Sequence, residues 1–322
     1  MQLGLLTDSL STLSRLEALD LAVELGIETV EIGLGGKHGG WSPAPHADLV
    51  ELLEDPAARQ RLQSDISERG LRLEALNAAG NPLHPVLGDR DDAVLRGALR
   101  IAEDLGVDTV VTMSGLPAAP GDSFPAWITT VWPPENLHLL EHQWNVAIDY
   151  WGDLAAEAES RGVKIAIEMH ANQLVYSVPG LLRLREAVGP TVGANFDPSH
   201  LFWMGADPLA AIDALRGTIH HVHAKDTRIE QAAAVRSRLE TIPNERVTER
   251  AWNYVAVGTG HPDGAAFWAR FADALRGAGY GGVLSIENED YSLSQPESVA
   301  LAARTLTAAL QPQLRTPSAP GI

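Results

Sequence analysis

Eight short runs rich in β-branched and aliphatic residues alternate with amphipathic stretches along this chain, and that alternation restricts its fold more than any other feature. The expected strands cover residues 3–7, 29–34, 71–77, 108–113, 163–169, 191–196, 218–224 and 282–287. Helical patterns lie between them at 11–26, 92–106, 142–162, 180–189 and 265–279, several ending in glycine as helices commonly do. Regular alternation favours a parallel sheet, and eight units in 322 residues fit a single (β/α)8 TIM barrel, an α/β fold, better than an open doubly wound sheet.

We expect the barrel to form one catalytic domain over residues 1–311, followed by a flexible C-terminal tail at 312–322. Two long connections follow strands four and seven, at 114–136 and 225–264, and loops of that length are usually functional lids or disordered. The first strand is followed by "TDSLST", without the glycine-rich turn of a dinucleotide-binding fold. The run "GLGGKHGG" after strand two matches neither that fingerprint nor a P-loop, so it is interpreted as a flexible loop.

Composition limits the classes of partner. A formal net charge of −18 argues against binding a nucleic-acid backbone, which requires clustered Lys and Arg. There are no cysteines, which excludes disulfides, thiolate zinc sites and a cysteine nucleophile. The N-terminus lacks a signal-like pattern and no segment approaches membrane-spanning length, so we expect a cytoplasmic protein with no membrane partner and a small-molecule substrate.

Four residues of metal-ligand type fall at the expected carboxyl ends of strands five to eight: Glu168, Asp197, His223 and Glu287. Chemistry in TIM barrels is located at this end of the strands. Asp197 has a second interpretation, because an Asp-Pro pair commonly caps a helix.

The residues two positions earlier on each strand should face the same side. They are Ala166, Asn195, His221 and Ser285. Barrel interiors are normally filled by Val, Ile and Leu, so three polar residues directly beneath the four candidates predict a layer of hydrogen bonds that orients them.

The segments "IAIEMH", "GANFDPSHLFW", "HHVHAKDTR" and "LSIENED" resemble the xylose isomerase-like superfamily of sugar phosphate isomerases and epimerases, over nearly the whole chain. Its relatives include ketose 3-epimerases, inosose isomerases and dehydratases, and type IV apurinic endonucleases. The resemblance implies that Glu168, Asp197, His223 and Glu287 bind one divalent cation. It also implies that Glu168 and Glu287 act as acid and base and that His200 contacts the substrate.

Three carboxylates and one imidazole form a hard, oxygen-rich site, which suits Mn²⁺ or Mg²⁺ ahead of Co²⁺ or Zn²⁺. The expected function is a divalent-metal-dependent sugar isomerase or epimerase that abstracts a proton next to a carbonyl through a metal-bound enediolate. The alternative is a lyase, dehydratase or deglycosidase acting on a 3-keto sugar or inosose by β-elimination. Two further readings are a type IV endonuclease, which the negative charge disfavours, and a non-catalytic sugar-binding subunit, which the paired glutamates disfavour.

Further candidates for substrate contacts lie near the expected strand ends: His170, Lys225, Arg228, His84 and Trp203. Ketose epimerases carry a second glutamate six residues after the strand-five ligand, and here that position is Leu174. This departure indicates that the substrate contacts differ from those of the epimerases. A homo-oligomer, either a dimer or a tetramer, is a further expectation.

Overall fold

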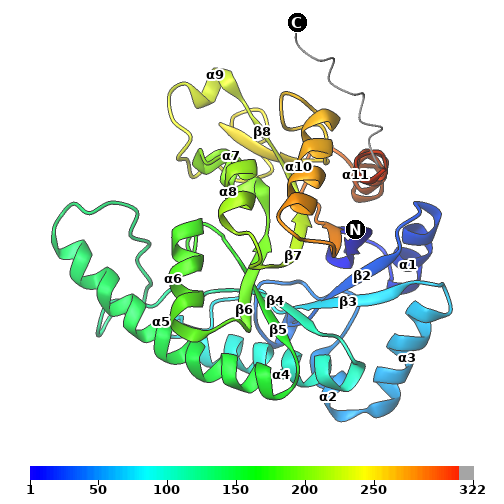
Figure 1. The fold of residues 1–322 in the computed structure, drawn as a ribbon, viewed down its shortest axis with the longest axis horizontal. Helices are drawn as coiled ribbons and strands as arrows, with labels where there is room; N and C mark the ends of the chain where they lie inside the picture. Colours follow the sequence, from blue (N-terminus) through cyan, green and yellow to red (C-terminus); the bar gives the residue numbers. More distant parts are fainter. Residues whose placement is uncertain (312–322) are drawn as a thin grey trace, which may run out of the picture.

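Eight parallel strands close into a barrel in the order β1-β10-β7-β6-β5-β4-β3-β2, surrounded by helices (Figure 1). The computed structural model describes residues 1–311, and the predicted tail at 312–322 lies outside them. The barrel strands are β1 (Gln2–Leu6), β2 (Thr29–Gly33), β3 (Arg72–Asn77), β4 (Thr109–Met113), β5 (Lys164–Glu168), β6 (Val192–Phe196), β7 (Ile219–Ala224) and β10 (Val283–Ile286). Each lies within one residue of its predicted range at either end, which confirms the predicted (β/α)8 TIM barrel.

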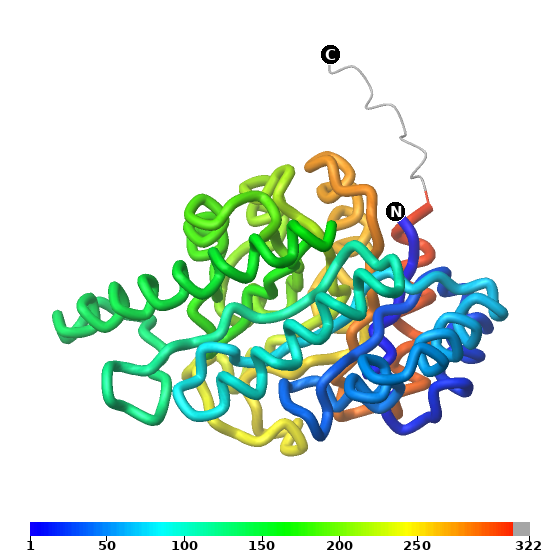
Figure 2. Tube along the Cα trace, turned by 90° about the horizontal axis from the view of Figure 1, so that it is seen from below, coloured from blue at the N-terminus to red at the C-terminus, as the bar shows by residue number. Residues whose placement is uncertain are grey.

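Five of the helices in the described chain follow the predicted periodic stretches, and two longer helices and several short ones lie outside them. They are α1 (Arg15–Glu24), α2 (Leu49–Glu54), α3 (Pro56–Ser67), α4 (Gly88–Leu105), α5 (Glu135–Ser160), α6 (Val178–Val188), α7 (Pro198–Met204), α8 (Pro208–Ala214), α9 (Gln231–Ala234), α10 (Ala265–Gly277) and α11 (Gln295–Leu310), with 3-10 turns η1 (Thr7–Leu10) and η2 (Gly36–His38). In both Figure 1 and Figure 2 the first strand lies beside the last helix, α11, so the two ends of the described chain meet where the barrel closes. Among the described residues, no helix combines the length and apolar character that crossing a bilayer requires.

Large aromatic side chains fill the space between strands and helices. Trp151 of α5 and Trp268 and Phe271 of α10 are fully buried. Both of these indoles find a hydrogen-bond acceptor, since Trp151 Nε1 donates to the Ser114 carbonyl and Trp268 Nε1 donates to Asp226 Oδ2. Burial of an aromatic ring is thus combined with satisfaction of its polar atom.

The long segment after β7 is folded. Asp226–Ile229 (β8) and Trp252–Val255 (β9) form a two-stranded antiparallel sheet. The buried carboxylate of Asp226 accepts backbone hydrogen bonds from Gly258 at 2.9 Å and Gly260 at 3.1 Å, which ties the end of the segment to its start. The segment therefore forms a wall beside the end of β7, and its role as a lid stays a prediction.

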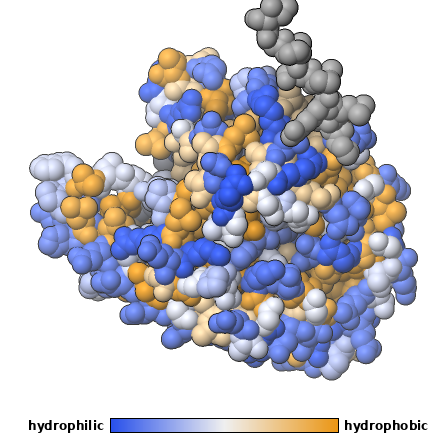
Figure 3. Space-filling model, viewed as in Figure 1, coloured by the Kyte–Doolittle hydropathy of each residue, from blue (hydrophilic) through white to orange (hydrophobic). Residues whose placement is uncertain are grey.

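The connection after β4 forms an arm that projects from the barrel together with the start of α5 (Figures 1 and 2). Helix α5 begins at Glu135, seven residues before the predicted periodic stretch, and thus lengthens this arm. Phe124 and Trp132 on it are 79% and 76% exposed. On the face drawn in Figure 3 the hydrophobic residues form small separate patches among hydrophilic ones.

Candidate metal centre and active site

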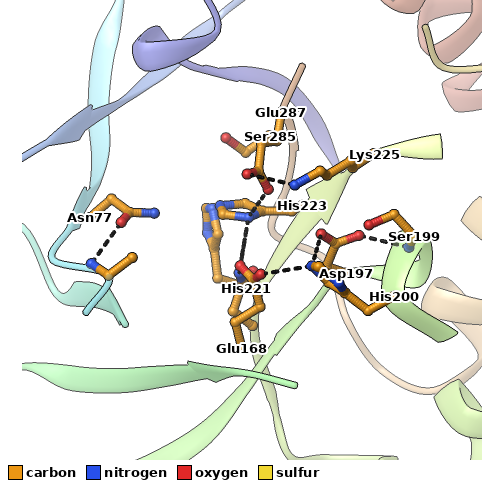
Figure 4. Close-up of polar contacts among 12 residues, drawn as sticks. Asn77, Glu168, Asp197, Ser199, His200, His221, His223, Lys225, Ser285 and Glu287 are labelled. Atoms are coloured by element: carbon orange, nitrogen blue, oxygen red, sulfur yellow. Dashed lines mark hydrogen bonds and ion pairs between the residues drawn. The ribbon is translucent and has the colours of Figure 1, made fainter. Parts of the chain in front are cut away.

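Four side chains from the carboxyl ends of adjacent strands converge at the mouth of the barrel (Figure 4). Glu168 ends β5, Asp197 follows β6, His223 lies near the end of β7 and Glu287 follows β10. One potential ligand atom from each lies within 4.8 Å of those of the other three. The structure thus brings together the four residues that the sequence singled out, and their role as ligands stays a prediction.

His223 is oriented by a carboxylate on the far side of its ring. Its Nε2 lies 3.1 Å from both carboxylate oxygens of Glu31, while Nδ1 lies 2.8 Å from Glu287 Oε2 and 3.1 Å from Glu168 Oε2. Because an ionised carboxylate only accepts, we assign a proton to Nε2 on the Glu31 side. When a cation is bound the ring would be neutral, with its Nδ1 lone pair toward the cation and the carboxylates of Glu168 and Glu287 beside it.

Asp197 caps the next helix with one carboxylate oxygen, and its other oxygen belongs to the candidate metal centre. Its Oδ1 accepts the Ser199 backbone N–H at 2.8 Å and caps α7, with Pro198 as the first helical residue. Its Oδ2 is buried and has no hydrogen-bond partner among the described residues. Burial raises the pKa of Asp197 well above its usual value, against the opposing charge of Lys225. A cation beside Oδ2 would remove that penalty, so the donor set fits a metal ion.

The two glutamates each direct one oxygen toward His223 and the other away from it. Glu168 Oε1 lies 3.2 Å from His200 Nε2, and Glu287 Oε1 lies 3.0 Å from Lys225 Nζ. Burial opposes ionisation of Glu168, but hydrogen bonds to His200 and His223 hold its pKa well below its usual value. Each glutamate can therefore offer one oxygen to a cation and keep a second one free.

Glu31 on β2 is a functional residue that the strand-end pattern missed. It is 1% exposed and accepts hydrogen bonds from His221 Nε2, Ser285 Oγ and Asn77 Nδ2, all at 2.9 Å. Burial would raise its pKa, but His223 and His221 hold that pKa well below its usual value. The signal for it was a single charged residue inside the apolar strand "TVEIGL".

The polar layer predicted beneath the strand ends is present, and its members bond different partners, which the sequence did not indicate. Asn195 Nδ2 lies 2.9 Å from Glu168 Oε2 and 3.1 Å from His223 Nδ1. His221 and Ser285 bond Glu31, and the ring of His221 also packs edge-on against that of His223. The fourth member, Ala166, packs with Ala75 and Val111 in a small apolar cluster.

Replacing Glu31 with glutamine is expected to weaken cation affinity by about 10- to 100-fold, because the residue that fixes the His223 ring loses its charge. Competition with a chromophoric chelator measures the dissociation constant. Glu28→Gln, on the exposed outer side next to β2, is the matched control, because it removes the same charge outside the barrel. Equal affinities for wild type and Glu31→Gln would contradict an orienting role.

Acidification is expected to release the cation. Burial raises the pKa of Asp197 in the cation-free protein, and the charges of Glu31 and Glu287 hold the pKa of His223 well above its usual value although burial opposes it. A cation binds the ionised carboxylate and the neutral imidazole, so it must displace any proton that these groups hold, and affinity falls as pH falls by about tenfold per pH unit for each displaced proton. Calorimetry in buffers of different ionisation enthalpy counts the released protons; a count of zero would contradict this coupling.

The side chains next to the four residues form an aromatic and imidazole wall. The rings of His200 and His170 have centroids 4.1 Å apart, and His200 Nδ1 lies 3.1 Å from the Tyr254 hydroxyl of β9. Burial lowers the pKa of His200 to about 3, so this ring is neutral at physiological pH. Trp41 packs edge-on against His170. His200 and His170 thus lie where the prediction of substrate contacts requires.

Lys225 is 2% exposed, and its Nζ bonds Glu287 and Glu289 and lies 4.4 Å from the centre of the Tyr254 ring. It is a buried neighbour of the site and not a surface ion pair. Trp203 is also buried, but it stacks in parallel on Trp252 of β9, with ring centroids 4.8 Å apart. Trp252 in turn packs edge-on against Tyr254 of the wall.

The structure places two other predicted contacts away from the four converging residues. His84 Nδ1 accepts the backbone N–H groups of Val86 and Leu87 and organises the turn into α4. Arg228 on β8 bonds Glu230 at 2.7 Å and lines a separate recess beside α9. Both residues were predicted as substrate contacts because they are close in sequence to strand ends. The course of the segment that follows each strand decides where their side chains lie.

A model of the xylose isomerase-like TIM barrel family matches residues 19–309. The chain is 45% identical over 313 residues to the uncharacterized protein YfiH of Bacillus subtilis, covering 95% of this chain and 98% of that protein. It is 32% identical over 171 residues to an inosose dehydratase of Geobacillus thermodenitrificans, covering 52% of this chain and 54% of the dehydratase. The chain therefore spans about half the length of that enzyme.

Among solved structures, the IolI protein with a bound zinc atom superposes with a TM-score of 0.66 at 20% identity, covering 96% of this chain and 98% of that one. At this identity the likeness concerns the fold alone. The family match agrees with the closed barrel. The chain belongs to the xylose isomerase-like TIM barrel family.

Proposed function

We propose that this protein is a divalent-metal-dependent enzyme that removes a proton next to the carbonyl of a sugar or cyclitol. The observation that carries the proposal is the pair of buried glutamates, Glu168 and Glu287, on either side of His223 Nδ1. Each has one oxygen at the candidate metal centre and a second oxygen outside it. A protein that only held a cation or a sugar would not need two such carboxylates.

Glu168, Asp197, His223 and Glu287 would hold the cation. When bound, such a cation polarises a carbonyl and stabilises the negative charge that develops on its oxygen. The donor set of three carboxylates and one imidazole favours Mn²⁺ or Mg²⁺, and the zinc in IolI extends the candidates to Zn²⁺. The identity of the metal is part of the proposal.

The residues differ in what each can do to a substrate. Glu168 is partnered at Oε1 by the neutral ring of His200, whereas Glu287 is partnered at Oε1 by the ammonium of Lys225. We assign Glu168 as the acceptor of the substrate proton because its second oxygen faces an uncharged ring, whereas the second oxygen of Glu287 is held by the ammonium of Lys225. In an isomerase or epimerase Glu287 would return a proton to the substrate. His200, His170 and Lys225 are placed to bind its hydroxyl groups.

β-Elimination is the second candidate, and the similarity to inosose dehydratases favours it. Dehydration of a ketone shares the first step with isomerisation, since the proton next to the carbonyl is removed in both. The two reactions differ only in whether a leaving group on the next carbon is then expelled. The ligands, Glu168 and Glu287 are therefore compatible with either outcome.

Proton exchange with solvent tests the common step. Metal-loaded protein in deuterated water should exchange the hydrogen next to the carbonyl in at least one member of a panel of ketoses, inososes and 3-keto-glycosides, observed by proton NMR. Chelator-treated protein is the control and should exchange nothing. A metal-loaded wild type that exchanges no member of the panel would refute the proposed function.

A further inference from the structure

The carboxyl group of Asp8, which is not on a barrel strand, occupies the space at the barrel mouth where Gly33 has no side chain. Asp8 lies in η1, directly after β1, and Gly33 ends β2. A Cβ atom added to Gly33 would collide with both carboxylate oxygens of Asp8. Gly33 is two residues beyond Glu31 and faces the same side of the strand. The Asp8 carboxyl thus takes the place of a Gly33 side chain, one layer above Glu31.

That layer is the one that holds the candidate metal ligands. Ser285 of β10 bonds Glu31, and Glu287 is two residues beyond Ser285, as Gly33 is beyond Glu31. The negative charges of Glu31 and Glu287 both act on the Asp8 carboxyl. Asp8 and Glu287 also line the same open recess, of about 520 Å³. A substrate that reaches Glu287 through this recess would pass beside Asp8.

The contacts of Asp8 leave one of its oxygens without a partner. Oδ2 accepts a hydrogen bond of 2.5 Å from Ser42 Oγ, whereas the buried Oδ1 has no hydrogen-bond partner among the described residues. Ser42 belongs to the connection after β2, where the Gly40 N–H bonds Asp91 and the Trp41 N–H bonds the Ala79 carbonyl. The glycine-rich run interpreted as flexible in the sequence is therefore attached at several points. Ser42, which follows this run, orients the carboxyl group of Asp8 through its hydrogen bond to Oδ2.

Burial raises the pKa of Asp8 to about 6, against the hydrogen bond from Ser42, so roughly a tenth of this carboxyl is protonated at pH 7 and about half near pH 6. A protonated carboxyl can donate, and the unpartnered oxygen is available to carry the proton. A carboxylic acid beside a glutamate of the candidate metal centre is an arrangement in which one group takes a proton and another gives one.

We propose that Asp8 is the acid that protonates a leaving hydroxyl or alkoxyl group, and that the net reaction is β-elimination from a carbonyl-containing cyclitol or sugar. This inference rests on the proposed proton abstraction and selects between its two outcomes. Glu168 takes the proton from the carbon next to the carbonyl, and the electron pair of that C–H bond becomes the new carbon–carbon double bond. The C–O bond on the following carbon breaks with its electron pair on oxygen, which takes the proton of Asp8 and departs as water or an alcohol. The Asp8 carboxylate then regains a proton from solvent.

Asp8→Asn separates the two steps. The variant is expected to lower the rate of elimination by on the order of 10²- to 10⁴-fold, the usual contribution of a positioned acid, while exchange of the hydrogen next to the carbonyl continues in deuterated water. Asp149→Asn, an exposed position on α5, is the matched control for loss of one negative charge and should leave both rates unchanged. Metal content and thermal midpoint of each variant are measured alongside, since both should match the wild type if the defect is chemical.

The leaving group provides a readout that a structural role would not move. A methyl 3-keto-glucoside expels an alkoxide that needs a proton, whereas its 4-nitrophenyl counterpart expels a stable phenolate. Asp8→Asn should therefore be strongly impaired on the first substrate and at most weakly on the second. Gly33→Ala, which displaces the carboxyl while keeping it, should reproduce this selectivity.

Equal losses on both glycosides, or wild-type elimination by Asp8→Asn, would overturn the role of Asp8 while leaving the proposed function intact. A wild type that exchanges the hydrogen but eliminates nothing from cyclitols or glycosides would also overturn it. Absence of exchange in the wild type would overturn the proposed function itself, and the inference with it.

Discussion

Asp197→Ala is expected to lower the metal content from about one divalent ion per chain to nearly zero. The substitution removes the buried Oδ2, which makes no hydrogen bond among the described residues and lies 3.4 Å from His200 Nε2, and leaves two glutamates and His223 without the candidate ligand that follows β6. Plasma mass spectrometry after dialysis against metal-free buffer measures the content. The variant also loses the cap of α7, which costs about 1 kcal/mol and should lower the thermal midpoint modestly.

The chain contains a matched control for that loss of the cap. Asp207 precedes Pro208 and caps α8 through the Leu209 N–H at 2.8 Å, but it is exposed. Asp207→Ala should therefore lose a comparable capping contribution and retain its metal. Full metal content in Asp197→Ala, or equal loss in both variants, would contradict the assignment of Asp197 as a ligand.

Glu168→Gln and Glu287→Gln are each expected to lower kcat by on the order of 10²- to 10⁴-fold, with KM changed far less. Glutamine keeps the size and one carbonyl oxygen of glutamate, so part of the metal binding persists, but the basic site is lost. Steady-state kinetics on a substrate identified by the exchange panel measures the effect. Glu186→Gln, exposed on α6, removes the same charge far from the barrel mouth and should be neutral.

Deuterium wash-out distinguishes the roles of the two glutamates. In an epimerase that works from two faces, removing one base still permits exchange from the epimer whose hydrogen faces the other. In a lyase with a single base and Asp8 as acid, Glu168→Gln should lose all exchange, whereas Glu287→Gln should retain some elimination. Two variants that turn over at the wild-type rate with metal bound would refute the proton-transfer mechanism.

The order and ends of the strands were accessible from the sequence because hydrophobic periodicity reports which side of a segment is buried. The predicted range 163–169 became Lys164–Glu168, and 191–196 became Val192–Phe196. Parallel strands of a barrel end on the same side, so the placement of Glu168 and Asp197 at one mouth followed from topology alone. The start of α5 was missed because the residues between Glu135 and the periodic stretch have little core to face.

Glu31 and Asp8 needed the tertiary structure. Glu31 bonds His221 and His223, some 190 residues later, only because closure of the barrel brings β2 opposite β7. Asp8 reaches the ligand layer only because Gly33 leaves room for it.

The sequence by itself determined the barrel, the alternation that points Asn195 inward and the four polar strand ends, since each depends on local periodicity and on the rule that parallel strands share one end. The tertiary structure decided which nitrogen of His223 faces Glu31 and which groups lie next to each glutamate oxygen. It also decided that His84 and Arg228 bond neighbours in their own segments. These properties depend on contacts between segments far apart in the chain, whose distances are set by the packing of the whole barrel and leave no periodic trace in the sequence.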